Sequence, residues 1–195
     1  MALELDRRTS ALLALDYQND VIDLVPHARE LGVLPRAAAA LDAARRAFLP
    51  VIHVRLAFRP GFPELGERSS LAMLKSWQPA RFVEGTPGVA FCAEVAPLPG
   101  EVVVTRRRVN PYLDTDLPAI LRAWGTETLV VMGVATGGVV LPTVRDGRDR
   151  DFRVVLLEDC CANQTEESHA FLIANVLSGA VIATSAEFVA ALASG

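Results

Sequence analysis

Two charged residues and a pair of glycines stand directly after apolar runs, where a strand would end. Asp16 follows the first such run, Arg106 follows a later one, and Gly137 with Gly138 follows another. A carboxylate can move a proton, a guanidinium binds carboxylates through two parallel hydrogen bonds, and amides in a glycine turn polarise a carbonyl oxygen. Brought together, these groups would form a site that binds or hydrolyses a small anion.

The glycine turn is the most informative of these segments, and it reads Gly133-Val-Ala-Thr-Gly-Gly-Val-Val-Leu-Pro-Thr143. An apolar run precedes it and a polar, helix-like segment follows, so we predict a strand, a tight turn and the start of a helix. The first turn of a helix leaves its amide donors unpaired, which suits an oxyanion or a carboxylate. No Ser, Cys or His follows Thr136 within the turn. The pattern therefore predicts a catalytic elbow that lacks a nucleophile.

The elements that must position these residues alternate between β-branched runs and segments with helical periodicity. Helices are predicted over residues 34–48, 115–125 and 163–178, and Ser185 is predicted to cap a last helix. The predicted strands are residues 10–15, 51–57, 102–105, 128–134, 153–157 and 180–183.

Strands that alternate with helices predict an α/β fold. We expect three layers: a mainly parallel, doubly wound, Rossmann-like sheet of about six strands with helices on both faces. The length of 195 residues predicts a single domain over residues 1–195. In such sheets ligands bind outside the carboxyl ends of the strands, where the winding reverses. The strand ends that carry Asp16, Arg106 and Gly138 are therefore expected to meet at one crevice.

Residues 58–101 depart from this alternation, because they are rich in proline and show no clear period. We predict a long loop with short helical turns, and loops of this length usually carry function or a subunit contact. Trp77 within the loop is expected to roof the crevice. The segment also leads us to expect a homodimer or a higher homo-oligomer.

Composition narrows the classes of partner. A net charge of −4 gives no general attraction to nucleic acid or to an anionic membrane. No apolar stretch is long enough to span a bilayer, and the N-terminus has no apolar signal region. The three cysteines have no zinc-site spacing. We therefore expect a cytoplasmic protein that binds neither membrane nor nucleic acid.

Several motifs of the chain resemble those of the isochorismatase-like hydrolases, also called the cysteine hydrolase family. The resemblance covers nearly the whole chain and implies that family's α/β fold. The motifs that carry it are Leu13-Ala-Leu-Asp-Tyr-Gln-Asn-Asp20, Glu84-Gly-Thr-Pro-Gly88, Thr115-Asp116-Leu117, the glycine turn, Thr143-Val-Arg145-Asp146 and Glu158-Asp-Cys-Cys-Ala162.

The resemblance also assigns places to the family's catalytic residues. Asp16 matches the catalytic aspartate, Arg106 stands at the lysine position, and Val139 stands at the position of the nucleophilic cysteine. The triad is therefore degenerate. Arg106 keeps the positive charge, but it cannot lose a proton near neutral pH.

Three functions remain open. The first is a hydrolase without a cysteine nucleophile that acts on a vinyl ether or a C–N bond of a small, carboxylate-bearing molecule. Asp16 would then be the general acid or the water-orienting base, and Arg106 the anchor, with its neighbours up to Arg108 suited to a dicarboxylate. The second is an inactive, anion-binding pseudoenzyme. The third is a cysteine hydrolase that uses Cys161.

The remaining expectations concern binding. The metal-binding residues of the related nicotinamidases would follow the second strand, where this chain reads Ala57-Phe-Arg-Pro60, so no metal and no cofactor is predicted. The partner is expected to be a small anionic molecule. The candidate substrate-binding residues are Gln18, Trp77, Tyr112, Gly137, Gly138 and Val139.

Overall fold

The computed structural model describes residues 3–193. Its core is one six-stranded sheet in the order β3-β2-β1-β4-β5-β6, and every neighbouring pair is parallel. This confirms the predicted α/β, doubly wound architecture, with a sheet that is wholly rather than mainly parallel. The strands are β1 (Ser10–Leu15), β2 (Val51–Leu56), β3 (Val102–Arg106), β4 (Thr128–Val134), β5 (Arg153–Ala162) and β6 (Val181–Ala183).

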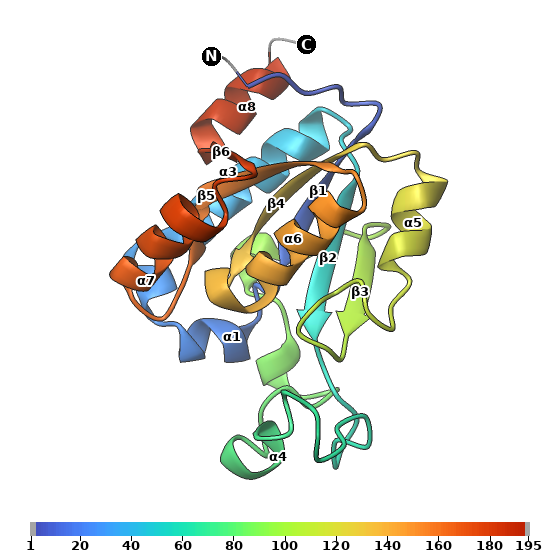
Figure 1. The fold of residues 1–195 in the computed structure, drawn as a ribbon, viewed down its shortest axis with the longest axis vertical. Coiled ribbons are helices and arrows are strands. Elements are labelled where there is room, and N and C mark those ends of the chain that lie inside the picture. The colour runs from blue at the N-terminus through green and yellow to red at the C-terminus, as the bar shows by residue number, and fades with distance from the viewer. Residues whose placement is uncertain (1–2, 194–195) are drawn as a thin grey trace.

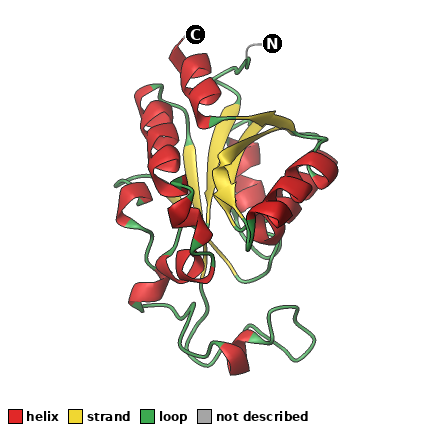
Figure 2. Ribbon diagram, turned by 90° about the vertical axis from the view of Figure 1, so that its left-hand side faces the viewer, coloured by secondary structure: helices red, strands yellow, loops and turns green. Residues whose placement is uncertain are grey.

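Helices cover both faces of the sheet (Figures 1 and 2), and each face has its own apolar core. Because β1 and β4 are central, all their residues are buried, which explains their unbroken apolar runs. One face packs against α1 (Asn19–Leu24), α2 (His27–Glu30), α3 (Val33–Arg46) and α8 (Ser185–Ala193). The other packs against α5 (Leu117–Ala123), α6 (Leu141–Asp149), and the π-helical turn η4 (Leu172–Val176) that continues α7 (Glu166–Phe171).

Strand β5 continues five residues beyond its predicted end at Leu157. The charged pair Glu158-Asp159 interrupts the apolar pattern, so the sequence indicated an end there. The strand nevertheless continues because Cys161 pairs with Gly133 of β4, past an irregularity in the β4–β5 register. Such a pairing depends on the neighbouring strand and leaves no local signal.

The cap of α8 lies one residue earlier than predicted. The Thr184 hydroxyl accepts a hydrogen bond from the Glu187 amide at 3.2 Å, and the Glu187 carboxylate accepts one from the Thr184 amide at 2.8 Å. This reciprocal pair is a capping box. Ser185 instead donates its hydroxyl to Asp159 on β5 at 2.6 Å, which fixes the helix to the sheet.

The irregular segment between β2 and β3 projects beyond the carboxyl ends of the strands, at the end of the molecule opposite the two termini (Figure 1). It contains only short turns: α4 (Leu74–Trp77), η1 (Pro87–Val89) and η2 (Ala93–Val95). The predicted long loop is thus confirmed, while its role as a subunit contact stays a prediction. Within the described part of the chain, no helix is long and apolar enough to cross a membrane.

Candidate active site

The winding of the sheet reverses at β1, which lies between β2 and β4. Asp16 is the first residue after β1 and is only 1% exposed. Its amide donates to the Val54 carbonyl at 2.9 Å, and its φ of 56° lies in the left-handed region, which few residues other than glycine adopt. Because backbone strain of this kind concentrates at functional sites, the conformation of Asp16 supports a functional role.

Arg106, the last residue of β3, reaches across the end of β2 to Asp16. Its Nε donates to both carboxylate oxygens, at 3.2 and 3.1 Å, and its Nη2 forms an ion pair with Oδ2. Nη1 donates to the Arg108 carbonyl at 2.6 Å. Arg106 is 5% exposed. The predicted pair is therefore brought together in a buried, charge-assisted contact.

Two opposing effects set the charge of Asp16. Burial raises the pKa of its carboxyl above the ordinary value, and the charge and the hydrogen bonds of Arg106 offset only part of that rise. A guanidinium keeps its proton at all ordinary pH values. The positive charge of Arg106 therefore favours the ionised form of Asp16, which is the form that can accept a proton.

The guanidinium of Arg106 is not exhausted by these contacts. Arginine has five N–H donors, and the contacts with Asp16 and with the Arg108 carbonyl involve Nε and one N–H on each terminal nitrogen. Among residues 3–193, one N–H on Nη1 and one on Nη2 therefore have no acceptor.

The glycine turn after β4 folds as a π-helical turn, η3 (Thr136–Val140), which leads directly into α6. The Gly137 amide donates to the Asn163 side chain at 3.1 Å, and the Gly138 amide donates to the Ala135 carbonyl at 3.0 Å. The Val139 side chain is 2% exposed and packs in the core beneath α6. The turn has the predicted elbow shape, but two of its amides are already hydrogen-bonded.

His169 contacts this turn, although no sequence pattern indicated it. Its Nδ1 lies 2.8 Å from the hydroxyl of Thr136, which is fully buried. Burial, together with the nearby His27, lowers the pKa of His169, so its ring is neutral near pH 7. The only sequence signal was a single histidine on a helix, which is indistinguishable from an ordinary packed one.

A comparison with family models matches residues 10–187 to the Isochorismatase domain. The chain belongs to the isochorismatase family. It is 28% identical to the maleamate amidohydrolase of Pseudomonas putida over 165 residues, 83% of this chain and 76% of that protein. It is also 28% identical to the ureidoacrylate amidohydrolase RutB of Methylobacterium radiotolerans over 194 residues, 89% of this chain and 75% of that protein.

Solved structures of isochorismatase-family proteins share the fold over the full length. One from Burkholderia thailandensis has a TM-score of 0.83 and 27% identity, covering 99% of this chain and 100% of that one. A putative hydrolase of the family from Chromobacterium violaceum has a TM-score of 0.79 and 30% identity, covering 100% and 99%. The chain is therefore a member of a family of hydrolases.

Gln18 lies beside Asp16, but its predicted role in substrate binding has to compete with three internal hydrogen bonds. Its side-chain amide donates to the carbonyls of Leu56 and Val89, both at 3.0 Å, and its oxygen accepts from the Leu56 amide at 2.7 Å. The side chain is fully buried. In this isochorismatase-family chain Gln18 joins the end of β2 to the projecting segment.

Tyr112 and Trp77 are not brought to Asp16. A β-carbon on Gly147 would lie 3.0 Å from the Tyr112 hydroxyl and 3.3 Å from Leu129, near the start of β4, so this hydroxyl faces the amino end of the sheet. Trp77 is 59% exposed on α4 of the projecting segment. Both side chains therefore lie away from the Asp16–Arg106 pair. Sequence spacing could not predict this, because it does not determine the direction in which a side chain points.

The three consecutive arginines do not act as one cluster. Arg107 donates to Glu64 at 3.0 Å and to Glu84 at 2.6 Å, so it ties β3 to the projecting segment. Arg108 lies 3.5 Å from Asp114. Of the three, only Arg106 contacts Asp16, and a dianion would find one guanidinium here rather than a basic patch.

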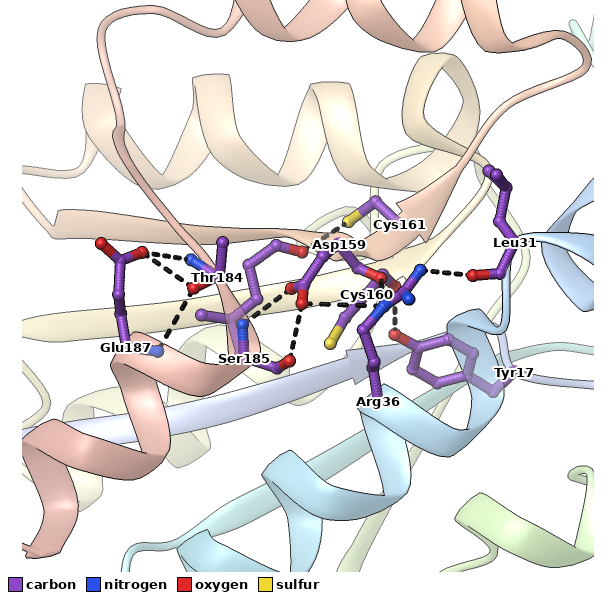
Figure 3. Close-up of polar contacts among 10 residues, drawn as sticks. Tyr17, Leu31, Arg36, Asp159, Cys160, Cys161, Thr184, Ser185 and Glu187 are labelled. Atoms are coloured by element: carbon purple, nitrogen blue, oxygen red, sulfur yellow. Dashed lines mark hydrogen bonds and ion pairs between the residues drawn. The ribbon is translucent and has the colours of Figure 1, made fainter.

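Neither cysteine of β5 has the properties of the family's nucleophile. The two thiols point to opposite sides of the strand (Figure 3), as adjacent strand residues must. Burial raises the pKa of the Cys161 thiol to about 12, against a smaller effect of a hydrogen bond from Gly133. Burial and Asp159 raise the pKa of Cys160 still further. Because only the thiolate is an effective nucleophile, both thiols are inert near neutral pH.

The polar groups around these cysteines fix the fold instead (Figure 3). Tyr17 donates its hydroxyl to the Cys160 carbonyl at 2.5 Å, and Arg36 of α3 donates to the Asp159 carbonyl at 2.7 Å. Asp159 also accepts from the Ser185 amide at 2.7 Å. This network anchors the residue that follows Asp16 against the end of β5.

Proposed function

We propose that this isochorismatase-family protein hydrolyses a C–N bond of a small, carboxylate-bearing molecule, with water in place of a cysteine nucleophile. The observation that carries the proposal is the buried Asp16–Arg106 pair at the reversal of the sheet. A carboxylate and a guanidinium are costly to bury. The pair lies at the carboxyl edge of the sheet, where α/β enzymes bind substrates, and this position supports a catalytic role for the two buried charges.

In the proposed reaction, the free N–H groups of Arg106 bind the substrate carboxylate and orient the C–N bond. Asp16 accepts a proton from a water molecule, whose oxygen attacks the carbonyl carbon. The tetrahedral intermediate collapses, the C–N bond breaks, and the departing nitrogen takes the proton back from Asp16. The turn η3 stabilises the negatively charged oxygen of this intermediate, and the amide of Val139 is our candidate hydrogen-bond donor.

Two considerations favour a C–N bond over a vinyl ether. Hydrolysis of a vinyl ether requires a proton delivered to carbon, whereas the charge of Arg106 favours the ionised form of Asp16. In addition, the relatives named above are amidohydrolases of maleamate and ureidoacrylate, names that denote carboxylate anions. Both considerations support an amide or ureido acid as the substrate of this chain.

The test is turnover of a panel of amic acids, ureido acids, their neutral amide counterparts and carboxylated vinyl ethers. We expect turnover of one of the acids, no turnover of its neutral counterpart, and a loss of about 100-fold or more in Asp16→Asn. Asp42→Asn removes an exposed carboxylate on α3 and serves as the matched control. Full activity in Asp16→Asn would refute the mechanism.

A second function, a non-catalytic binding protein for small carboxylates, is favoured by one specific observation. Val139 is packed in the core, and the neighbouring amides of Gly137 and Gly138 already have partners. This alternative predicts saturable binding of the same acids, loss of binding in Arg106→Ala, and no product from any of them. Product formation by the wild-type protein decides between the two functions.

A further inference from the structure

A cavity of about 550 Å³ lies between α6 and the end of η4, and none of its lining residues contacts Asp16. Its walls are the second half of α6, the turn that leads into β5 and the end of η4. The start of β5 is at the amino edge of the sheet, whereas Asp16 is at the carboxyl edge. The volume is in the range of small-molecule sites.

Arg145 and Arg148 line this cavity from one face of α6, three residues apart. Neither side chain has a hydrogen bond or an ion pair among residues 3–193. The contrast is clearest within the motif Thr143-Val-Arg145-Asp146, where the Thr143 hydroxyl donates to the Val139 carbonyl and Asp146 accepts from Asn110. Arg145 is the motif residue whose charge the fold leaves unmatched.

The exposed side chain of Arg148 lies beside Gly179 and is not neutralised there. Its guanidinium lies against Gly179, just beyond the end of η4, so closely that any β-carbon at position 179 would overlap it. The end of a helix attracts a cation through its dipole, but the described residues offer these N–H groups no acceptor. The lack of a side chain at position 179 thus leaves room for the guanidinium of Arg148, whose donors have no acceptor among residues 3–193.

The same cavity is lined by two carboxylates, Asp149 and Asp151, which also have no ion pair within the described chain. The buried side chains of Val144 and Leu177 supply an apolar wall. A simple anion would be attracted by the arginines and repelled by the aspartates. The arginines and aspartates of the lining form no ion pairs with one another. A ligand that carries both a negative and a positive charge could therefore pair with all four side chains.

We propose that this cavity binds a small zwitterion of the amino acid class that has an apolar side chain. Arg145 and Arg148 receive its carboxylate, Asp149 and Asp151 receive its ammonium group, and the apolar wall contacts its side chain. The site is independent of the proposed hydrolysis at Asp16, since it lies at the opposite edge of the sheet. It is a binding site, and no reaction is assigned to it.

The test is isothermal titration calorimetry of the whole chain with three probes of similar shape: leucine, isovalerate and isoamylamine. We expect leucine to bind at least about tenfold more tightly than either singly charged probe. Arg145→Gln and Arg148→Gln should each weaken leucine binding about tenfold. Gly179→Ala should do the same, because its methyl group displaces the guanidinium of Arg148.

Arg122→Gln is the matched control, since it removes an exposed arginine from α5 and should leave leucine binding unchanged. Circular dichroism and the melting temperature establish that each variant is folded. The proposal is overturned if leucine gives no saturable heat, if isovalerate binds as tightly as leucine, or if the double variant Arg145→Gln, Arg148→Gln retains full affinity.

Discussion

The guanidinium of Arg106 lies directly against the carboxylate of Asp16, although 90 residues separate them in the sequence. The strand order β3-β2-β1 brings their carboxyl ends to the same edge of the sheet. The contact replaces the lysine–aspartate pair that the family resemblance implies. It keeps the electrostatic attraction but removes a group that can exchange a proton.

Replacing Arg106 by a neutral residue should destabilise the folded protein. We expect Arg106→Ala to lower the free energy of unfolding by about 3–5 kcal/mol at pH 7, because it leaves a buried carboxylate unpaired. The pKa of Asp16 in the folded variant would then rise further above its unfolded value, so the variant should regain stability as the pH is lowered. Urea unfolding at pH 7 and pH 5 measures both effects. A variant equally destabilised at both values would contradict this account.

Restoring the family's cysteine should not by itself restore its reactivity. In Val139→Cys the new thiol would be buried, and the residue at the family's lysine position is Arg106, which cannot accept its proton. We expect slow alkylation by iodoacetamide in this variant and faster alkylation when Arg106→Lys is added. Mass spectrometry over time gives the two rates. Equal rates would mean that the residue at position 106 does not control the reactivity of position 139.

The native cysteines should resist modification. Because Cys160 and Cys161 are buried and their thiol pKa values are raised, neither should react with iodoacetamide in the folded protein near neutral pH, whereas both should react in urea. We also expect Cys161→Ala to retain any hydrolytic activity. Peptide mapping after alkylation checks the first statement. Loss of turnover in a folded Cys161→Ala protein would revive the cysteine hydrolase alternative.

Stability should fall at low pH partly through Glu101. Burial opposes ionisation of this carboxyl, yet hydrogen bonds from Arg45 and the Leu98 amide hold its pKa at about 2. The folded pKa is below the unfolded value, so this contribution is present above about pH 4.5 and is lost as the pH falls towards 2. Glu101→Gln should remove about 1–2 kcal/mol of that pH dependence. Thermal unfolding from pH 6 to pH 2.5 makes the comparison.

A glycine in the projecting segment offers a test of packing. Any β-carbon on Gly88 would overlap the carboxylate of Asp20, which is buried and accepts from the Phe82 amide at 2.7 Å. Gly88→Ala should therefore destabilise the protein by about 1–3 kcal/mol. Gly66→Ala, where nothing lies within 4 Å of the added carbon, should be nearly neutral in the same denaturant titration.

The strands and their convergence could be predicted because both follow from local pattern and a general rule of parallel sheets. Apolar runs located β1 and β4 to the residue, and topology placed Asp16 near Arg106. The extension of β5 and the contact of His169 with Thr136 could not be predicted, because each depends on a partner distant in sequence. For the same reason, the orientations of Trp77 and Tyr112 were not accessible from spacing.

The hydrogen bonds of Gln18 have a consequence for local opening and solvent exchange. The Leu56 amide at the end of β2 donates to this side chain rather than to a neighbouring strand, and the same side chain holds the Val89 carbonyl. The amide hydrogen of Leu56 can exchange with solvent once its hydrogen bond to Gln18 breaks. If the Gln18 side chain moves away, its hydrogen bond to the Val89 carbonyl breaks as well. We therefore expect the end of β2 and the turn at Val89 to open together, so that hydrogen exchange at the Leu56 amide reports on both.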